Sequence, residues 1–345
     1  MRRLPVFFLL DCSESMVGDK LDKMQNAMGA IVSALRSNPY ALETVYMSVI
    51  AFAGIAKTIA SLTELYSFYP PKLPLGGGTS LGAALETLMD ELDRRVVKTT
   101  SEQKGDWKPF VFLITDGRST DKTENAASRW QAKYAKRATL IAIGLGKEAD
   151  FASLKKLTEN VIIYEEADKS EYTALIKWIS DSTIAQSKSV GEGVENSPLP
   201  NLDEIALKLV KEPPANADDS CVVLVGRCQK TKKPYLIKYE RSQTALGKGE
   251  HRAEVVYYDT VGAFMIDEDY FKWSQVQPSA ITVNTSLLSG APSCPYCGNH
   301  TAFAMCNCGK LTCASGGEAI CPWCGVELFF GGEGGGDFDV GRSLG

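Results

Sequence analysis

The sequence is short of histidine. Only His251 and His300 among its 345 residues have this side chain, and neither lies close in sequence to the acidic segments described below. Histidine is the commonest general acid or base near neutral pH, because its unperturbed pKa lies in that range. General acid–base catalysis is therefore poorly supplied, and we expect a protein that is not an enzyme.

A surplus of positive charge is also missing. The chain has 37 lysines and arginines against 42 aspartates and glutamates, for a formal net charge of −5, and its basic residues form no stripe. Proteins that bind nucleic acids or anionic membranes in general use a basic face to neutralise phosphates. The composition therefore disfavours both classes of partner.

Long hydrophobic runs are absent as well. No run reaches the roughly 18 apolar residues that a membrane span needs. Arg2 and Arg3 precede the short apolar run Val6–Leu10, but Asp11 ends this run before it has the length of a signal-peptide core. We therefore predict a cytoplasmic protein without a membrane anchor.

Short apolar strands alternate with amphipathic helices through the first half of the chain. One helix has Leu21, Met24, Met28, Ile31 and Leu35 along one face. The expected buried strands are 4–10, 45–52, 110–115, 139–144 and 161–164, with an antiparallel edge strand at 57–62. This alternation predicts a doubly wound, mostly parallel α/β sheet with ligands at the strand C-termini.

The composition changes along the chain and predicts five segments. Residues 1–186 form the α/β domain, and residues 187–200, rich in Ser, Gly, Glu and Pro, form a linker. Strand-like runs at 221–225, 235–239 and 254–258 predict a β-rich module over 201–290. A small metal-binding module over 291–330 precedes a tail, 331–345, whose seven glycines predict disorder.

Oxygen-bearing side chains follow two of the predicted strands. Asp11, Ser13 and Ser15 come directly after the first strand, and Asp116 follows the strand at 110–115. Thr79 follows three glycines and precedes a helix, where its hydroxyl can approach a ligand closely. Hard cations such as Mg²⁺ prefer oxygen ligands. The pattern therefore predicts a metal site at this edge of the sheet.

This constellation resembles the von Willebrand factor A (vWA) domain and its metal-ion-dependent adhesion site, in which Asp-x-Ser-x-Ser is joined by a separate Thr and a separate Asp. The resemblance covers about residues 1–186. It implies that Ser13, Ser15 and Thr79 coordinate Mg²⁺, or Mn²⁺ or Ca²⁺, and that Asp11 and Asp116 hold the ion directly or through water. An open coordination position would accept a carboxylate from a partner.

Other interpretations of the same residues are less consistent with the chemistry. Each hydroxyl or carboxylate taken alone can be a helix cap or a turn former, but five coincide at strand ends. A haloacid-dehalogenase-type phosphatase needs an acid–base Asp where Ser13 stands, and a cysteine phosphatase using Cys12 needs Arg where Gly18 stands. Residues 76–80 lack the lysine of a nucleotide-binding loop. We expect Cys12 to pack in the core.

Ten cysteines are present, and seven of them lie between Cys294 and Cys324, which indicates metal binding in a reduced compartment. Two matching Cys-Pro-x-Cys-Gly segments predict one structural, zinc-ribbon-like Cys₄ site for Zn²⁺. Its ligands would be Cys294, Cys297, Cys321 and Cys324. A second site formed by Cys306, Cys308, Cys313 and His300 is an open alternative to free buried cysteines. We place Cys221 and Cys228 in the core of the β-rich module.

The order of a vWA domain, a β-rich segment and a terminal cysteine module resembles the bacterial TerY-type proteins, which are associated with tellurite resistance and phosphorylation-linked stress systems. The resemblance implies partners that include a protein kinase and a PP2C-type phosphatase. The leading hypothesis is a stress-response adaptor that binds a partner's carboxylate through its metal. A metal-dependent phosphoester hydrolase using Asp11 and Asp116 is the alternative, and nucleic-acid binding through the zinc ribbon is a third.

Overall fold

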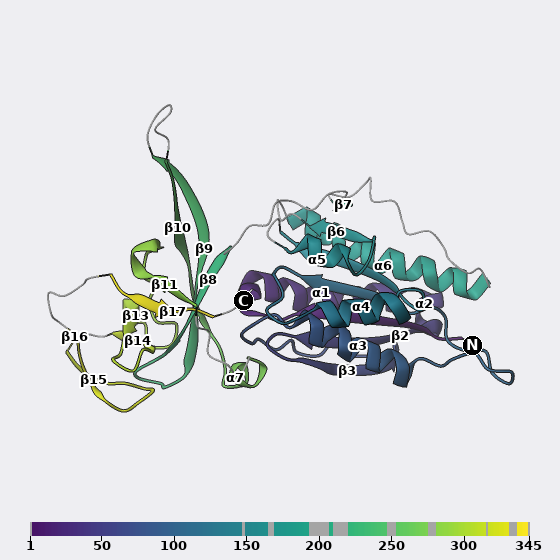
Figure 1. The fold of residues 1–345 in the computed structure, drawn as a ribbon. Helices are drawn as coiled ribbons and strands as arrows, with labels where there is room; N and C mark the ends of the chain where they lie inside the picture. Colours follow the sequence, from purple (N-terminus) through teal and green to yellow (C-terminus); the bar gives the residue numbers. More distant parts are fainter. Residues whose placement is uncertain are drawn as a thin grey trace. The chain divides into compact units, whose positions relative to one another are not determined.

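The computed structural model describes most of the chain and divides it into two compact units. The described residues are 2–146, 149–164, 169–192, 207–209, 220–246, 253–274, 281–314, 317–330 and 337–343. The first unit comprises Met1–Pro74 and Thr79–Asn216, and the second comprises Leu75–Gly78 and Ala217–Gly345. Figure 1 shows both units, and each is described by itself below.

The first unit is built on a seven-stranded sheet in the order β3-β2-β1-β4-β5-β6-β7. The strands are β1 (Leu4–Asp11), β2 (Val45–Phe52), β3 (Ala56–Glu64), β4 (Phe110–Thr115), β5 (Thr139–Leu145), β6 (Val161–Tyr164) and β7 (Leu207–Leu209). Adjacent strands from β2 to β6 pair in parallel, whereas β3 and β7 are antiparallel edges. The predicted mostly parallel α/β fold is therefore confirmed, and the antiparallel edge strand is present.

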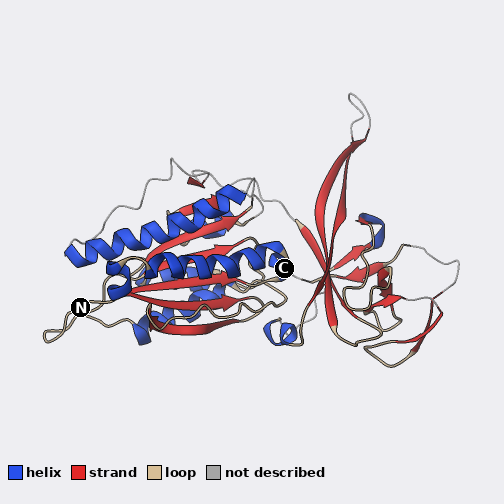
Figure 2. Ribbon diagram, turned by 180° about the vertical axis from the view of Figure 1, so that it is seen from behind, coloured by secondary structure: helices blue, strands red, loops and turns tan. Residues whose placement is uncertain are grey.

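Helices cover both faces of this sheet. Figures 1 and 2 view the sheet from opposite sides, and each shows helices in front of the strands. They are η1 (Glu14–Met16), α1 (Asp19–Arg36), α2 (Pro39–Thr44), α3 (Leu81–Arg95), α4 (Glu124–Lys133), α5 (Phe151–Lys155) and α6 (Lys169–Glu192). Phe7 and Leu9 of β1 pack in a core with residues of α3, α4 and α5. Phe8 and Leu10 point to the opposite face because strand side chains alternate. No described helix combines the length and apolar character needed to span a membrane.

The winding of the sheet reverses beside the end of β1. The chain runs from β1 to β2 on one side of it and later to β4 on the other, so the direction of winding reverses between β1 and β4. In open α/β sheets, ligands bind outside the strand C-termini at such a switch point. Asp11 ends β1, and Asp116 directly follows β4. The topology therefore brings both carboxylates to the expected edge.

The second unit contains a six-stranded sheet in the order β12-β10-β9-β8-β14-β13 and two sheets of two strands each. The strands are β8 (Cys221–Arg227), β9 (Pro234–Leu246), β10 (Ala253–Met265), β11 (Thr282–Asn284), β12 (Leu288–Ser289), β13 (Thr301–Met305), β14 (Leu311–Ala314), β15 (Gly317–Ile320), β16 (Glu327–Phe330) and β17 (Asp339–Gly341). Helix α7 (Asp269–Trp273) and the 3₁₀ turn η3 (Thr285–Leu287) complete it. The long hairpin of β9 and β10 is prominent in Figure 1.

The unit boundaries differ from those expected. Residues 187–192 of the predicted linker belong to α6, and β7, placed in the β-rich module, pairs with β6 of the first sheet. The rest of that linker, 193–200, lies outside the described residues. The β-rich and cysteine segments are one unit rather than two, because β14 pairs with β8.

The C-terminal segment also differs from the expectation of a disordered tail. Within it, β17 pairs with β11, and Phe338 packs against the core of the second unit. The backbone N–H of Ser343 donates a hydrogen bond to the carbonyl of Val223 over 2.9 Å. The glycine-rich stretch 331–336 lies outside the described residues. Local glycine content did not reveal the apolar pair Phe338 and Val340 as core residues.

Candidate metal centres

The carboxylates and serines of the first unit converge at the ends of β1 and β4. The Ser15 hydroxyl donates a hydrogen bond to Asp116 Oδ1 over 2.6 Å, and the Oγ atoms of Ser13 and Ser15 lie 3.0 Å apart. Ser13 N–H donates to Asp11 Oδ1 over 2.9 Å. Asp11 and Ser13 are fully buried, and Asp116 and Ser15 are nearly so. Four of the five predicted oxygen residues therefore form one buried cluster.

Thr79 completes this cluster from a third segment. Its side chain is 1% exposed, and its Oγ1 atom has no hydrogen-bond partner among the described residues. A Cβ atom built on Gly117 would lie 3.6 Å from Ser15 Oγ and 3.7 Å from Thr79 Oγ1, so both hydroxyls border the same small space. A buried hydroxyl without a partner is costly. The arrangement is explained if the hydroxyl is a ligand for a cation.

Two segments that the sequence analysis did not single out hold the site together. Asp11 Oδ2 accepts a hydrogen bond from the hydroxyl of Thr115 over 2.5 Å. The backbone N–H of Thr79 donates to Thr120 Oγ1 over 2.9 Å, and the backbone N–H of Thr120 donates to the Thr79 carbonyl over 2.8 Å. The loop after Asp116 therefore clamps Thr79. The short run of hydroxyl residues after Asp116 was the available signal.

Asp121 fixes the start of α3 beside Thr79. Its two carboxylate oxygens accept hydrogen bonds from the backbone N–H groups of Gly82 and Ala83 over 3.0 and 2.9 Å. Ser80, at the N-cap position, makes no side-chain capping bond. An acid at a helix N-terminus satisfies free N–H groups and interacts favourably with the helix dipole. Asp121 therefore caps α3 from a separate loop.

The electrostatics of the buried oxygen cluster favour a cation. Burial, together with the charge of Asp116, raises the pKa of Asp11 to about 7, although hydrogen bonds from Thr115 and Ser13 act in the opposite direction. The ammonium of Lys20, on α1, lies 2.5 Å from Asp116 Oδ2. Two acids and three hydroxyls form the hard oxygen set that suits Mg²⁺, Mn²⁺ or Ca²⁺. The residues present therefore fit a divalent ion.

Cys12 is a core residue, as expected. Its side chain is completely buried, and its sulfur lies 3.6 Å from the carbonyl of Leu10. Burial and the charge of Asp11 raise the pKa of Cys12 well above its usual range. Because the thiolate is the nucleophilic form of cysteine, this residue is chemically inert at neutral pH.

Eight cysteines of the second unit form two clusters of four. Within each cluster the sulfur atoms all lie within 4.8 Å of one another. The first cluster contains Cys228, Cys294, Cys297 and Cys313, and the second contains Cys306, Cys308, Cys321 and Cys324. The predicted single site, which joined the two Cys-Pro-x-Cys segments, is therefore wrong. Each segment instead combines with other cysteines.

The second predicted site is wrong as well, since its cysteines separate. Cys306 and Cys308 join the second cluster, whereas Cys313 joins the first. His300 is exposed and belongs to neither cluster. Cys228 lies in the core of the second unit, as expected, and is also a member of the first cluster. Cys221 is half-buried and remains outside both clusters.

The spacing of the sulfurs fits zinc. Cys297 and Cys313 lie 3.7 Å apart, as do Cys306 and Cys324. A tetrahedral Zn²⁺ with Zn–S bonds of about 2.3 Å places its sulfurs about 3.8 Å apart. The described cysteines form no disulfides. Each cluster therefore has the ligand number and the spacing of a closed structural zinc site.

The cysteines within each cluster differ in pKa, because they differ in the hydrogen bonds they accept. Burial raises the pKa of Cys294 and of Cys306 to about 12. Burial acts in the same direction on Cys228 and Cys321, but hydrogen bonds from backbone N–H groups and neighbouring side chains outweigh it and lower the pKa of each to about 7. Zinc binding requires thiolates, so loading releases protons.

Strand register explains why Cys228 belongs to the first cluster. Strands β8 and β14 are parallel neighbours, with Gly226 opposite Leu311 and Arg227 opposite Thr312. The next residue in each case is a cysteine: Cys228 directly follows β8, and Cys313 lies within β14. The two sulfurs are therefore brought side by side by sheet pairing. Local cysteine spacing carries no information on this pairing.

The cysteine turns share one backbone conformation. Gly298, Gly309 and Gly325 end three of the turns with φ values of 73°, 78° and 77°. In the fourth, Lys232 takes the equivalent place, with φ of 60° and its N–H donating to the Cys228 carbonyl over 2.9 Å. Thr231 stands where the other turns have a second cysteine, and its N–H donates to Cys228 Sγ over 3.4 Å. Residues 228–232 therefore form a similar turn that carries one cysteine ligand instead of two.

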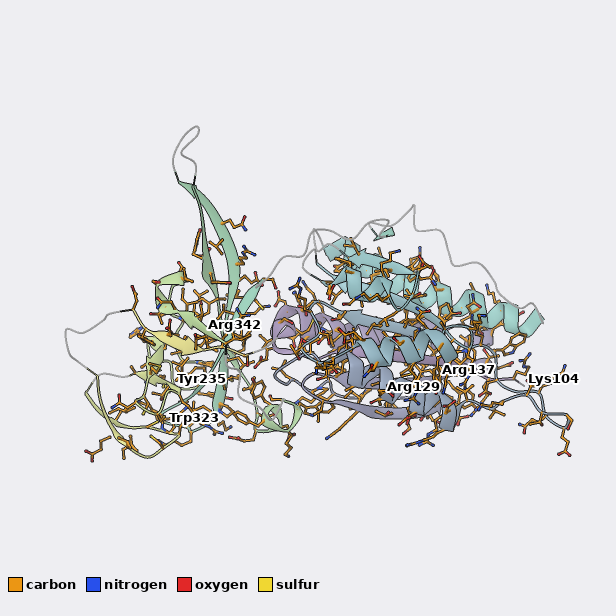
Figure 3. All side chains as sticks on the ribbon, viewed as in Figure 1. Lys104, Arg129, Arg137, Tyr235, Trp323 and Arg342 are labelled. Atoms are coloured by element: carbon orange, nitrogen blue, oxygen red, sulfur yellow. The ribbon has the colours of Figure 1, made fainter. Side chains whose placement is uncertain are left out.

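A cation–aromatic stack links the two cysteine clusters. The guanidinium of Arg227 lies 4.5 Å from the ring centre of Trp323, which is labelled in Figure 3. Arg227 also donates a hydrogen bond to the Lys232 carbonyl over 2.9 Å and forms an ion pair with Glu268. Trp323 Nε1–H donates to the Leu311 carbonyl over 2.7 Å. One side chain thus contacts the turn of the first cluster and the tryptophan of the second.

Comparison with known families agrees with both centres. The family model described as the von Willebrand factor type A domain matches residues 6–177, and the model described as the TerY-C metal binding domain matches residues 218–345. The chain is therefore a von Willebrand factor type A domain protein, with the oxygen site of that class. It is more particularly one in which a TerY-C metal binding domain follows the vWA domain.

Individual relatives match a part of the chain. Matrilin-3 from Homo sapiens is 27% identical over 159 residues, which are 45% of this chain and 32% of matrilin-3. Inter-alpha-trypsin inhibitor heavy chain H6 from Homo sapiens is 26% identical over 180 residues, 47% of this chain and 13% of that protein. The chain thus spans a third or less of these relatives.

Solved structures with similarity include a von Willebrand factor type A protein from Catenulispora acidiphila, with a TM-score of 0.42 and 13% identity over 76% of this chain and 55% of that one. Another is proximal thread matrix protein 1 from the mussel byssus, whose MIDAS motif is occupied by zinc. It has a TM-score of 0.37 and 20% identity over 54% of this chain and 46% of that chain.

Proposed function

We propose that this protein is a non-enzymatic adaptor that captures a carboxylate of a partner protein through a divalent ion on its vWA domain. The observation that carries the proposal is the buried hydroxyl of Thr79, which borders the same space as Ser15 and has no protein partner among the described residues. Mg²⁺ held there by Ser13, Ser15 and Thr79, with Asp11 and Asp116, would keep coordination positions open to a ligand from outside.

The second unit would provide a further contact surface for this role. Two zinc ions in the cysteine clusters would stabilise it, and closed Cys₄ sites have no open position for a substrate. From the resemblance to TerY-type proteins, we propose that the adaptor acts in a phosphorylation-linked stress system connected with tellurite resistance. A protein kinase and a PP2C-type phosphatase are the proposed partners. Cysteines that form no disulfides and are grouped for zinc binding favour the reducing cytoplasm as its compartment.

The test is affinity purification from native cells with and without added Mg²⁺, with the zinc content of the second unit checked in each sample. Wild-type protein should recover a partner only when Mg²⁺ is added, and Asp11→Ala should recover none in either condition. Asp90→Asn removes an exposed carboxylate of α3 and is the matched control. Equal recovery by wild type and Asp11→Ala would refute the proposal. Metal-dependent turnover of phosphoesters, lost in Asp11→Ala, would favour the hydrolase instead.

A further inference from the structure

A cavity of about 490 Å³ opens on the second unit beside the first cysteine cluster. Its polar lining includes the lysines Lys230 and Lys232 and the amides Gln229 and Asn299, and its apolar lining includes Ala319 and Ile320. Lys230 and Lys232 are exposed, and Ile320 is 57% exposed. None of the described residues that line the cavity is an aspartate or glutamate. Two lysines and an exposed isoleucine therefore line one concave surface.

The backbone of Lys232 is strained in a way that its counterparts avoid. The three other cysteine turns have glycine at this position, whereas Lys232 adopts a φ of 60° with a full side chain. A non-glycine residue in this left-handed conformation costs about 1–2 kcal/mol. Backbone strain of this kind persists when the surrounding structure requires it, and it clusters at functional sites. Glycine would satisfy the turn without this cost, which points to a role for the lysine side chain outside the turn.

The hydrogen bonds that hold the turn at Lys232 involve its backbone. The backbone N–H and carbonyl of Lys232 make the bonds that hold the turn, to Cys228 and from Arg227. Glycine would make both bonds equally well, because neither involves a side-chain atom of residue 232. The neighbouring Lys233 lies with its ammonium 5.9 Å from the ring centre of Tyr296. Lys230 and Lys232 are the lysines among the described residues that line the cavity.

We propose that this cavity binds an acidic segment of a partner protein. Carboxylates of the segment would pair with Lys230 and Lys232, and an apolar side chain between them would cover Ile320. The mixed lining favours a peptide over a free anion, which would leave Ile320 uncovered. The site would give the second unit of the proposed adaptor a specific contact with a partner. This proposal depends on the proposed function only in assuming that a protein partner exists.

A competing explanation is that the lysines balance the negative charge of the zinc–thiolate cluster. Four thiolates around one Zn²⁺ carry a net negative charge, and Cys297 of the first cluster also lines the cavity. Lysines that only balance this charge would affect zinc retention and would not discriminate among peptides. The two explanations therefore differ in what a lysine substitution changes.

The experiment measures fluorescence anisotropy of a labelled peptide of alternating glutamate and leucine on the full-length, zinc-loaded protein. A peptide with glutamine in place of glutamate is the control probe. Replacing both lysines, in K230M/K232M, should weaken binding of the acidic peptide about three- to tenfold, since exposed ion pairs contribute modestly. Lys310→Met removes an exposed lysine near Trp323 and should leave peptide binding unchanged. Zinc content should be the same in all variants.

A second variant and a second probe keep the outcome decisive. Lys232→Gly should raise the unfolding temperature and weaken binding of the acidic peptide. If the lysine had only a structural role, its replacement would not weaken peptide binding. Asp11→Ala should bind the peptide as wild type does, so failure of the vWA site is distinguishable from failure of this one. Equal affinity for both peptides, loss of zinc in K230M/K232M, or displacement of the peptide by inorganic phosphate at matched ionic strength would each overturn the proposal.

Discussion

At the scale of single residues, the Thr79 hydroxyl carries most of the information about the metal site. It is buried without a hydrogen-bond partner among the described residues, so it costs stability in the metal-free protein. Thr79→Val keeps the shape and removes the hydroxyl. We expect metal-free stability to be unchanged or up to about 1–3 kcal/mol higher, and Mn²⁺ affinity to fall at least about tenfold. Urea unfolding and calorimetric titration measure the two effects.

Thr115→Val is the matched control for this prediction. The Thr115 hydroxyl donates to Asp11, so its removal takes a hydrogen bond from a buried carboxylate. This variant should lose about 1–3 kcal/mol of stability in the metal-free protein. If Thr79→Val were destabilised to the same degree, the Thr79 hydroxyl would have a structural partner and the interpretation would be wrong.

The pKa of Asp11 predicts an unusual dependence on pH. In the folded protein this pKa is raised to about 7, whereas an unfolded aspartate titrates near 3.9. The folded state therefore binds more protons between these values, so the stability of the Mg²⁺-free protein should decrease as pH rises through this window. Over the same window Mg²⁺ affinity should increase, because protons compete with the metal. Urea unfolding of wild type and Asp11→Asn at several pH values measures this, and identical profiles would contradict it.

At the scale of elements, the sequence predicted the site residues whose place depends on the local sequence pattern. Asp11, Ser13 and Ser15 follow one strand, Asp116 follows another, and parallel strands bring such ends to one edge. The cysteine pairs were also recognisable, since each lies on a local turn. How the pairs combine depends on the register of β8 against β14, which brings Cys228 to Cys313. Long-range strand pairing leaves no signal in the spacing of the cysteines.

The cap of α3 gives a prediction at this scale. Asp121 accepts two backbone N–H bonds at the helix start, next to Thr79. Asp121→Ala should cost about 0.5–2 kcal/mol of stability and should also weaken Mn²⁺ binding, because Thr79 loses its support. Asp150→Ala removes a comparable cap, on Ser153 of α5, and should cost similar stability without changing Mn²⁺ affinity. Equal Mn²⁺ affinity in both variants would show that the α3 cap does not position Thr79.

At the scale of the whole molecule, the two cysteine clusters predict a metal stoichiometry. Wild-type protein should hold two zinc ions, and Cys228→Ser should hold one tightly, because its other cluster is intact. Cys221→Ser, which lies outside both clusters, should keep two. Elemental analysis of purified protein distinguishes these outcomes. One zinc in wild type, retained in Cys228→Ser, would restore the single-site interpretation.

Capture of a partner's carboxylate requires a divalent ion at the vWA oxygen site. The most direct measurement is a Mn²⁺ titration followed by electron paramagnetic resonance, on zinc-loaded full-length protein. Wild type should take up a Mn²⁺ ion that Asp11→Ala does not, with oxygen coordination, while both retain their zinc. Equal Mn²⁺ binding by the two proteins, or none by either, would contradict the central claim.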